Sequence, residues 1–272
     1  MRRAGRVAVW LLGIAAALAV LFVGALFALQ DRMIFPAPRG PLPAASAGLA
    51  LEAIETPDGE RLAALWHAPE AGEPTVLFLH GNGTAIARLE PVAAAWASLA
   101  YGFLAPAWRG YPGSTGAPSE AGLLIDAEAA YDWVAVRTDG PIVVYGQSLG
   151  SGAAVHVAAE RDPAALVLEA PYDSVLAVSS ARFPFVPVGA LLRHPFRSDR
   201  KIGRVRAPVL VVHGTADGVI PIAHGRALHA LAPDGARFVE VPGATHFDIG
   251  ARAFPDVVAF VRDAVPNTGP ND

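Results

Sequence analysis

The 272-residue chain is 53% hydrophobic and only 17% charged, which excludes an intrinsically disordered protein. It contains no cysteine, so disulfides, thiol catalysis and cysteine-ligated metal sites are excluded too. The net charge of −4 provides no basic field for nucleic acid, and the length is that of one large domain or two small ones.

The first thirty residues contain a segment that is long enough to cross a membrane. Residues 7–29 form an uncharged run that would span about 35 Å as a helix, more than the hydrocarbon core of a bilayer. Arg2, Arg3 and Arg6 precede the run, so the positive-inside rule predicts a cytoplasmic N-terminus and an extracytoplasmic remainder. A cleaved signal peptide is the alternative, although this run is longer than a signal needs. We predict a single-pass membrane anchor over residues 1–30.

A proline-rich linker over residues 31–48 is predicted next, because proline cannot continue a helix. Two strand-like runs, residues 51–57 and 61–67, then flank Asp58-Gly59, a turn signal typical of a β-hairpin.

Short apolar runs alternate with longer amphipathic ones in the rest of the chain, which we predict to be one domain over residues 49–266, with a tail over 267–272. This alternation predicts a mostly parallel, doubly wound α/β sheet of about eight strands with helices on both faces. The further strands are expected at residues 75–79, 103–107, 142–145, 165–168, 209–212 and 237–241. The helices are expected near residues 86–100, 119–137, 149–160, 222–231 and 255–264.

Residues 171–205 break the strand–helix rhythm, since a regular unit would carry one helix there. We predict that they form an inserted lid, in which Phe183 and Phe185, together with Tyr172 near its start, are candidate substrate-binding residues. The alternative is that these apolar side chains only pack the insertion onto the domain.

The motif Gly146-Gln147-Ser148-Leu149-Gly150 has the form G-x-S-x-G and lies between a predicted buried strand and an Ala/Gly-rich helix. A sharp strand–serine–helix turn needs small residues two positions before and after the serine, and it exposes the hydroxyl above the sheet. Ser148 is therefore the candidate nucleophile, with the Leu149 N–H directed at a developing oxyanion. The alternative is a glycine-rich turn with an incidental serine.

A serine nucleophile needs a histidine base that a carboxylate holds in place. His246 lies in the loop after the last predicted strand, where sites of parallel sheets assemble. Asp217, in the loop after residues 209–212, is the preferred acid, while Asp173 and Asp248 compete with it. The order Ser148, Asp217, His246 is that of the α/β hydrolases.

The second oxyanion donor is expected in the loop His80-Gly81-Asn82-Gly83, because glycine lets the backbone approach a substrate closely. The Asn82 N–H is the candidate donor. His80 is expected to be satisfied by the loop backbone rather than to act as the base.

Together these motifs resemble α/β-hydrolase-fold serine hydrolases, in particular the membrane-anchored "alpha/beta hydrolase domain" proteins and the serine aminopeptidase-like hydrolases. The matching stretches are HGNG, WRGYPGSTGAPSEAGLLIDAEAAYDWV, GQSLGSG, HGTADGVIP and GATHF, in the order in which that family has them. The resemblance implies an α/β-hydrolase fold, the triad Ser148, Asp217 and His246, and a structural role for residues 108–126 beside the oxyanion loop. Two departures are Ser151, where the family often has glycine, and the short, individual lid.

These residues predict hydrolysis of a carboxylic ester or thioester through an acyl-enzyme, with an amide as the open alternative. No cofactor, no metal and no nucleic acid partner is expected, and the substrate is a small or lipid-like acyl compound near the membrane. Two alternatives stay open: a serine peptidase, and a membrane-tethered binding or scaffold protein that has the fold without activity.

Overall fold

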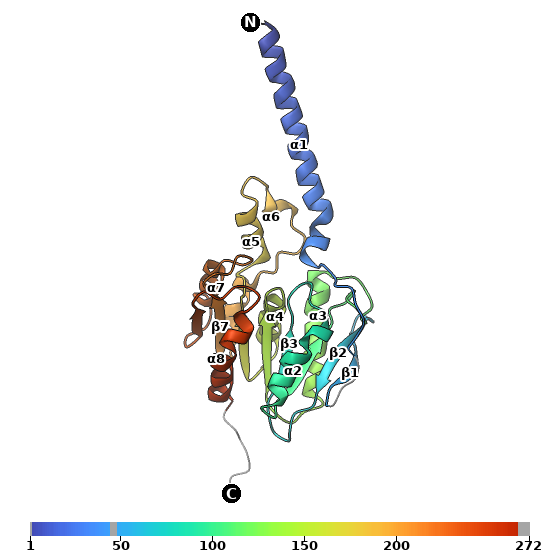
Figure 1. Cartoon of the computed structure of the whole chain (residues 1–272), viewed down its shortest axis with the longest axis vertical. Helices are drawn as coiled ribbons and strands as arrows, with labels where there is room; N and C mark the ends of the chain where they lie inside the picture. The colour runs from blue at the N-terminus through green and yellow to red at the C-terminus, as the bar shows by residue number, and fades with distance from the viewer. Residues whose placement is uncertain (1, 44–47, 266–272) are drawn as a thin grey trace.

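The computed structural model describes residues 2–43 and 48–265 of the chain. Residues 44–47 of the predicted linker and the predicted tail 267–272 lie outside the described residues. A single sheet of eight strands forms the centre of the domain (Figure 1), in the order β1-β2-β4-β3-β5-β6-β7-β8. The strands are β1 (Ala50–Glu55), β2 (Arg61–His67), β3 (Thr75–Leu79), β4 (Gly102–Pro106), β5 (Ile142–Gln147), β6 (Ala165–Glu169), β7 (Val209–Gly214) and β8 (Arg237–Val241).

Strand direction follows the two kinds of connection in the sequence. β1 and β2 form the predicted antiparallel hairpin, in which Ile54 pairs with Leu62, and Gly59 in its turn has a φ of +89° that suits glycine. β2 also runs antiparallel to β4, whereas β4, β3, β5, β6, β7 and β8 are all parallel to one another. The predicted mostly parallel, eight-stranded sheet is confirmed.

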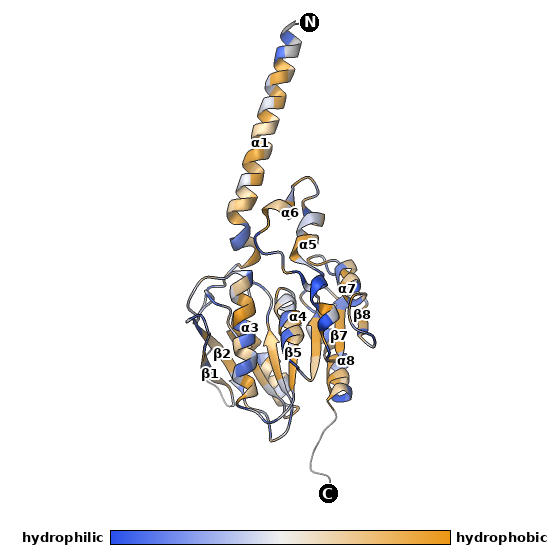
Figure 2. Ribbon diagram, turned by 180° about the vertical axis from the view of Figure 1, so that it is seen from behind, coloured by the Kyte–Doolittle hydropathy of each residue, from blue (hydrophilic) through white to orange (hydrophobic). Residues whose placement is uncertain are grey.

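Helices cover both faces of the sheet (Figures 1 and 2). α2 (Glu90–Ala97) and α8 (Ile249–Ala264) share one face, where the rings of Trp96 and Phe254 lie 5.0 Å apart. α3 (Glu120–Ala135) and α4 (Gly150–Glu160) pack side by side on the other face. The strands between them are buried on both sides, which explains their nearly continuous apolar sequences. The remaining helix beside the sheet is α7 (Ile222–His229).

The bounds of two helices, α2 and α8, differ from the prediction. α2 is preceded by a 3₁₀ turn (Ile86–Leu89) and stops at Ala97, ahead of a left-handed Ala100 that a helix cannot accommodate. α8 begins six residues before the predicted residue 255, with Pro255 inside it. Ile249, Ala253, Val257 and Val261 are completely buried at four-residue spacing, so one apolar stripe holds the helix together across the proline.

The insertion, residues 171–205, replaces one long helix by four short ones between β6 and β7. They are α5 (Val175–Arg182), α6 (Val188–Leu191) and two 3₁₀ turns, Ser198–Arg200 and Ile202–Arg204. α5 buries no residue completely, whereas Phe196 and Ile202 are buried in the main core. The second half of the insertion is therefore part of the domain, and α5–α6 stand above it (Figure 1).

The N-terminal helix α1 (Arg2–Ile34) projects away from the domain, and its surface is strongly apolar (Figure 2). An 18-residue stretch within residues 6–34 has a mean hydropathy of 2.6, and the helix is long and apolar enough to cross a membrane. The last turn contacts the domain, because Gln30 and the following Phe35 are buried. Phe35 packs against Phe196, with ring centroids 6.2 Å apart.

Candidate active site

The serine of the G-x-S-x-G motif lies in a strained turn between β5 and α4. Ser148 has a φ of +49°, in the left-handed region that a residue with a Cβ rarely adopts. A Cβ on Gly150 would overlap the Leu79 carbonyl oxygen, and one on Gly146 would overlap the Ala154 side chain. The two glycines thus allow strand, turn and helix to approach closely, as the motif predicts.

Three side chains from three loops form a continuous hydrogen-bonded chain at the carboxyl edge of the sheet. The Ser148 hydroxyl lies 2.9 Å from His246 Nε2 and can donate to it. On the other side of the ring, His246 Nδ1 lies 2.7 Å from Asp217 Oδ2, to which its N–H can donate. The arrangement lets the ring accept a proton from the serine while the carboxylate faces the positive charge that results.

Asp217 is held as a carboxylate by its surroundings. Burial alone raises the pKa of this group, but hydrogen bonds from His213, His246 and the Ile220 N–H outweigh that effect and hold the pKa well below its usual range. Its second oxygen accepts from the N–H groups of Val219 and Ile220, both at 2.8 Å. These backbone bonds orient the carboxylate toward the imidazole.

The two competing aspartates have other partners. Asp173 lies 2.8 Å from the Nδ1 of His224, a histidine on α7. Asp248 accepts from both the backbone and the hydroxyl of Thr245. Of the three candidate acids, Asp217 is the one that contacts His246.

The loop after β3 reaches the serine, as expected for an oxyanion loop. A Cβ placed on Gly81 would lie 3.2 Å from the Cβ of Ser148, so glycine permits the approach. In the described part of the chain, no protein acceptor takes the N–H of Asn82 or of Leu149. Unpaired backbone N–H groups near a serine hydroxyl can stabilise a negative charge that develops there.

The buried His80 supports this loop, in agreement with the structural role predicted for it. Its Nδ1 lies 2.8 Å from the Gly81 carbonyl oxygen, and burial lowers its pKa to about 4. The Trp108 indole N–H donates to the His80 carbonyl oxygen at 3.1 Å, and the Gly83 N–H donates to the Tyr111 hydroxyl at 3.4 Å. The segment after β4 thus supports the loop after β3.

A buried carboxyl group under the elbow was missed in the sequence. Glu169 ends β6, and its carboxyl accepts from the Tyr145 hydroxyl at 2.5 Å and from Gln147 Nε2 at 2.8 Å. Burial raises the pKa of Glu169. Its backbone carbonyl also accepts from the Ser148 N–H, and Gln147 Oε1 accepts weakly from the Gly81 N–H. An acidic residue that ends a wholly apolar run was the signal that could have identified it.

His213 was also left without a role, although it is the penultimate residue of β7 and lies four residues before Asp217. Its Nε2–H donates to the Ile220 carbonyl oxygen at 2.9 Å, and the same nitrogen lies 3.4 Å from Asp217 Oδ2. The ring is completely buried. It therefore fixes the loop that carries Asp217.

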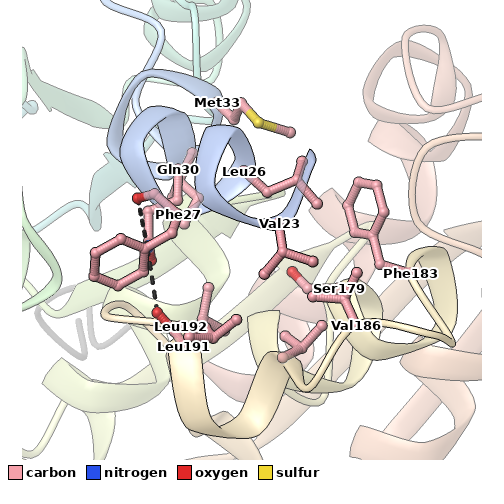
Figure 3. Close-up of a pocket in the computed structure, with 12 residues that line it drawn as sticks. Val23, Leu26, Phe27, Gln30, Met33, Ser179, Phe183, Val186, Leu191 and Leu192 are labelled. Atoms are coloured by element: carbon pink, nitrogen blue, oxygen red, sulfur yellow. Dashed lines mark hydrogen bonds between the residues drawn. The ribbon is translucent and has the colours of Figure 1, made fainter. Parts of the chain in front are cut away.

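The three candidate substrate-binding residues lie in different surroundings. Tyr172 is 2% exposed and its hydroxyl donates to the Leu149 carbonyl oxygen, so it supports the elbow from within. Phe185 is 99% exposed at the tip of the insertion. Phe183 lines a groove between α1 and the insertion (Figure 3). Among the described residues, no group of three or more His, Asp or Glu side chains could hold a metal ion.

Comparisons with known proteins agree with this architecture. An uncharacterized protein of Mycobacterium tuberculosis is 37% identical over 228 residues, which cover 80% of this chain and 81% of that protein. The alpha/beta hydrolase domain-containing protein WAV2 of Arabidopsis thaliana is 33% identical over 260 residues, which cover 83% of this chain and 84% of that protein.

Among solved structures, the Pyrococcus furiosus esterase Pf2001 has a TM-score of 0.66 at 17% identity and covers 84% of this chain and 98% of its own. That likeness bears on the fold alone. The family described as "Serine aminopeptidase, S33" matches residues 71–198. With these relatives and this sheet, the chain belongs to the α/β hydrolases, and its residues 71–198 are similar to the serine aminopeptidase S33 family.

Proposed function

We propose that this α/β hydrolase cleaves a carboxylic ester or thioester through an acyl-enzyme on Ser148. The observation that carries the proposal is the position of His246, within 2.9 Å of the Ser148 hydroxyl and 2.7 Å of the Asp217 carboxylate. Each of these three side chains alone has a structural explanation, but hydrogen bonds that link all three are what nucleophilic catalysis by serine requires.

In the first step, His246 Nε2 takes the proton of Ser148 as its Oγ attacks the substrate carbonyl carbon. The resulting oxyanion accepts hydrogen bonds from the N–H groups of Asn82 and Leu149, while Asp217 stabilises the imidazolium. His246 then protonates the leaving alcohol or thiol as the tetrahedral intermediate collapses. Water, deprotonated by the same ring, hydrolyses the acyl-enzyme and restores the serine.

The surroundings of the site favour an ester or thioester substrate over a peptide. An aminopeptidase has to hold the substrate ammonium group with a carboxylate, and the candidates in the neighbouring loops, Asp173 and Asp248, already hold His224 and Thr245. The groove that Phe183 lines exposes mainly apolar side chains. We therefore place ester and thioester hydrolysis ahead of amide hydrolysis.

We further propose that α1 is an uncleaved anchor and that the domain lies outside the cytoplasm. The length and hydropathy of residues 6–34 support the anchor, and Arg2, Arg3 and Arg6 support the orientation. Protease added to cells after permeabilisation of the outer envelope should digest the domain. Protection of the domain would reverse the orientation.

The test of the reaction is labelling of the full-length protein by a fluorophosphonate, which reports an activated serine without knowledge of the substrate. The wild type should be labelled and should hydrolyse acetyl esters, and Ser148→Ala should lose both while remaining folded. The matched control is Ser98→Ala, a surface serine bonded to its own helix, which should behave as the wild type. Absence of labelling in a folded wild type would favour the inactive scaffold.

A further inference from the structure

The groove between α1 and the insertion encloses about 490 Å³, part of which is open to solvent (Figure 3). Its two walls come from segments about 160 residues apart in the chain. α1 contributes Val23, Leu26 and Ile34, and the insertion contributes Phe183, Val186 and Leu192. The exposed lining is overwhelmingly apolar, so it has nothing to offer a charged ligand.

Polar contacts at one side hold the two walls together. Gln30 Nε2 donates to the Leu191 carbonyl oxygen at 3.2 Å, and the Arg193 N–H donates to Gln30 Oε1 at 2.8 Å. The Arg193 guanidinium also donates to Asp31 at 3.0 Å. The groove is therefore built between two elements with a defined separation.

The outer end of the groove is continuous with the apolar surface of α1. Val23 and Leu26 are half-buried against the groove, whereas Val20 and Leu21 are 72% and 68% exposed. The tip of the insertion also exposes an apolar side chain, that of Phe185. An apolar surface of this kind suits the hydrocarbon region of a bilayer, and a lipid tail can pass from that region into the groove without crossing water.

At its Ile34 end, the groove lies next to the loop after β3. Ile34 lines the groove, and its carbonyl oxygen lies 3.5 Å from the Asn82 side-chain nitrogen. Two residues later, Pro36 faces the same loop, since a Cβ added to Gly83 would lie 3.7 Å from the Pro36 carbonyl oxygen. From Val23 to Ile34 the helix rises about 16 Å, which is the scale of an extended hydrocarbon chain rather than of an acetyl group.

We propose that this groove binds the long acyl chain of an ester or thioester resident in the bilayer. α1 is then both the membrane anchor and one wall of the substrate site. The proposal rests on the hydrolase function proposed above, because the acyl carbonyl has to extend beyond the groove, past the loop that carries Asn82, to reach Ser148. It assigns the acyl chain, rather than the leaving group, to the groove.

The first test compares Leu26→Trp, which fills the groove, with Leu21→Trp, which adds the same side chain to the exposed face of α1. Full-length protein in lipid nanodiscs is assayed with acyl esters from acetyl to hexadecanoyl. Leu26→Trp should lower kcat/KM for the hexadecanoyl ester about tenfold or more relative to the acetyl ester, because displaced methylenes lose their apolar contacts. Leu21→Trp should keep the wild-type ratio.

Val186→Trp, on the opposite wall, should reproduce the loss and guards against a local defect of α1. The acetyl ester reports whether each variant is folded and active. An unchanged hexadecanoyl-to-acetyl ratio in both groove variants, with acetyl hydrolysis intact, would overturn the groove while leaving the hydrolase function standing. Failure of the wild type on every ester would instead count against the proposed function.

The second test does not depend on turnover. Ser148→Ala protein in nanodiscs is photolysed with a hexadecanoyl ester that carries a diazirine on its chain, and the labelled peptides are mapped. Labelling should concentrate on Leu26 and Phe183 and should fall in Leu26→Trp but not in Leu21→Trp. Equal labelling of Val20 and Leu21, unaffected by Leu26→Trp, would mean contact with bulk lipid only and would refute the proposal.

Discussion

The elbow region and the groove region of this hydrolase are held together by different forces. At the elbow, Ser148, His246 and Asp217 are linked by directional hydrogen bonds and seated on loops of a buried sheet. At the groove, α1 meets the insertion mainly through half-exposed apolar side chains. A reacting atom that is misplaced by 1 Å can cost about a hundredfold in rate, whereas an acyl chain needs only an apolar surface. Changes at the elbow should therefore affect turnover, and changes at the groove should affect selectivity.

The largest effect is expected for His246→Ala. Without the base, kcat on an acetyl ester should fall by about five to six decades, and adding Ser148→Ala should cost little more, because the members of a triad act as one unit. The matched control is His229→Ala on α7, because the ring of His229 contacts the Ala236 carbonyl oxygen and not the elbow. Additive losses in the double variant would show that the two residues act independently.

Asp217→Asn should lower kcat by about three to four decades, the scale of a neutralised triad acid. Asp173→Asn and Asp248→Asn serve as controls and should stay within a few-fold of the wild type. A normal Asp217→Asn together with a crippled Asp173→Asn would move the acid to the loop after β6.

Asp217→Asn should also change how the stability of the protein depends on pH. The pKa of Asp217 is lower in the folded chain than in the unfolded one, so the carboxylate stabilises the fold above about pH 4, and this contribution is lost as the pH falls through the folded pKa. The free energy of unfolding in urea should therefore differ most between wild type and Asp217→Asn at neutral pH, and the difference should become smaller in acid. A gap that widens in acid would contradict the charge assigned to Asp217.

Glu169 offers a smaller and more informative test of the elbow. Glu169→Ala leaves the Tyr145 hydroxyl and Gln147 without their acceptor and frees the side chain that contacts Gly81, so kcat should fall about 10- to 100-fold. Glu169→Gln keeps a hydrogen-bonding group of the same shape and should restore most of that activity. An equal loss in both variants would point to the charge rather than to positioning.

The pH dependence of stability should also differ between the wild type and Glu169→Gln. Burial raises the pKa of Glu169, so the folded state holds the proton more tightly and the wild type loses stability as the pH rises from the ordinary carboxyl range through the raised pKa. The glutamine variant cannot titrate, so its urea midpoint should decline less over that interval. Identical profiles would contradict a buried carboxyl group at this site.

The smallest effects are expected at the groove, from the pair Phe183→Ala and Phe185→Ala. Phe183 lines the groove, with its ring 6.5 Å from that of Phe22, so its truncation should shift the preference among acyl chain lengths a few-fold. Phe185 is 99% exposed, so its truncation should leave the preference and the melting temperature nearly unchanged in detergent. The reverse order of effects would place chain selection at the tip of the insertion.

Much of the fold was predictable because it depends on short-range patterns. Apolar runs, the Asp58-Gly59 turn and the glycines around Ser148 each act through neighbouring backbone, and they indicated the strands, the hairpin and the elbow. The boundaries of α8 were wrong because Pro255 is a local stop signal, whereas the helix is held by burial against the sheet.

The sequence by itself therefore established the sheet, the order of Ser148, Asp217 and His246, and the apolar N-terminal segment. Which aspartate touches His246, the buried Glu169 beneath the elbow and the contact of α1 with the insertion all required the folded chain. Each of these is a pairing between segments far apart in sequence. Such pairings depend on the path of the backbone and on which polar groups burial leaves without water, and no local pattern encodes either.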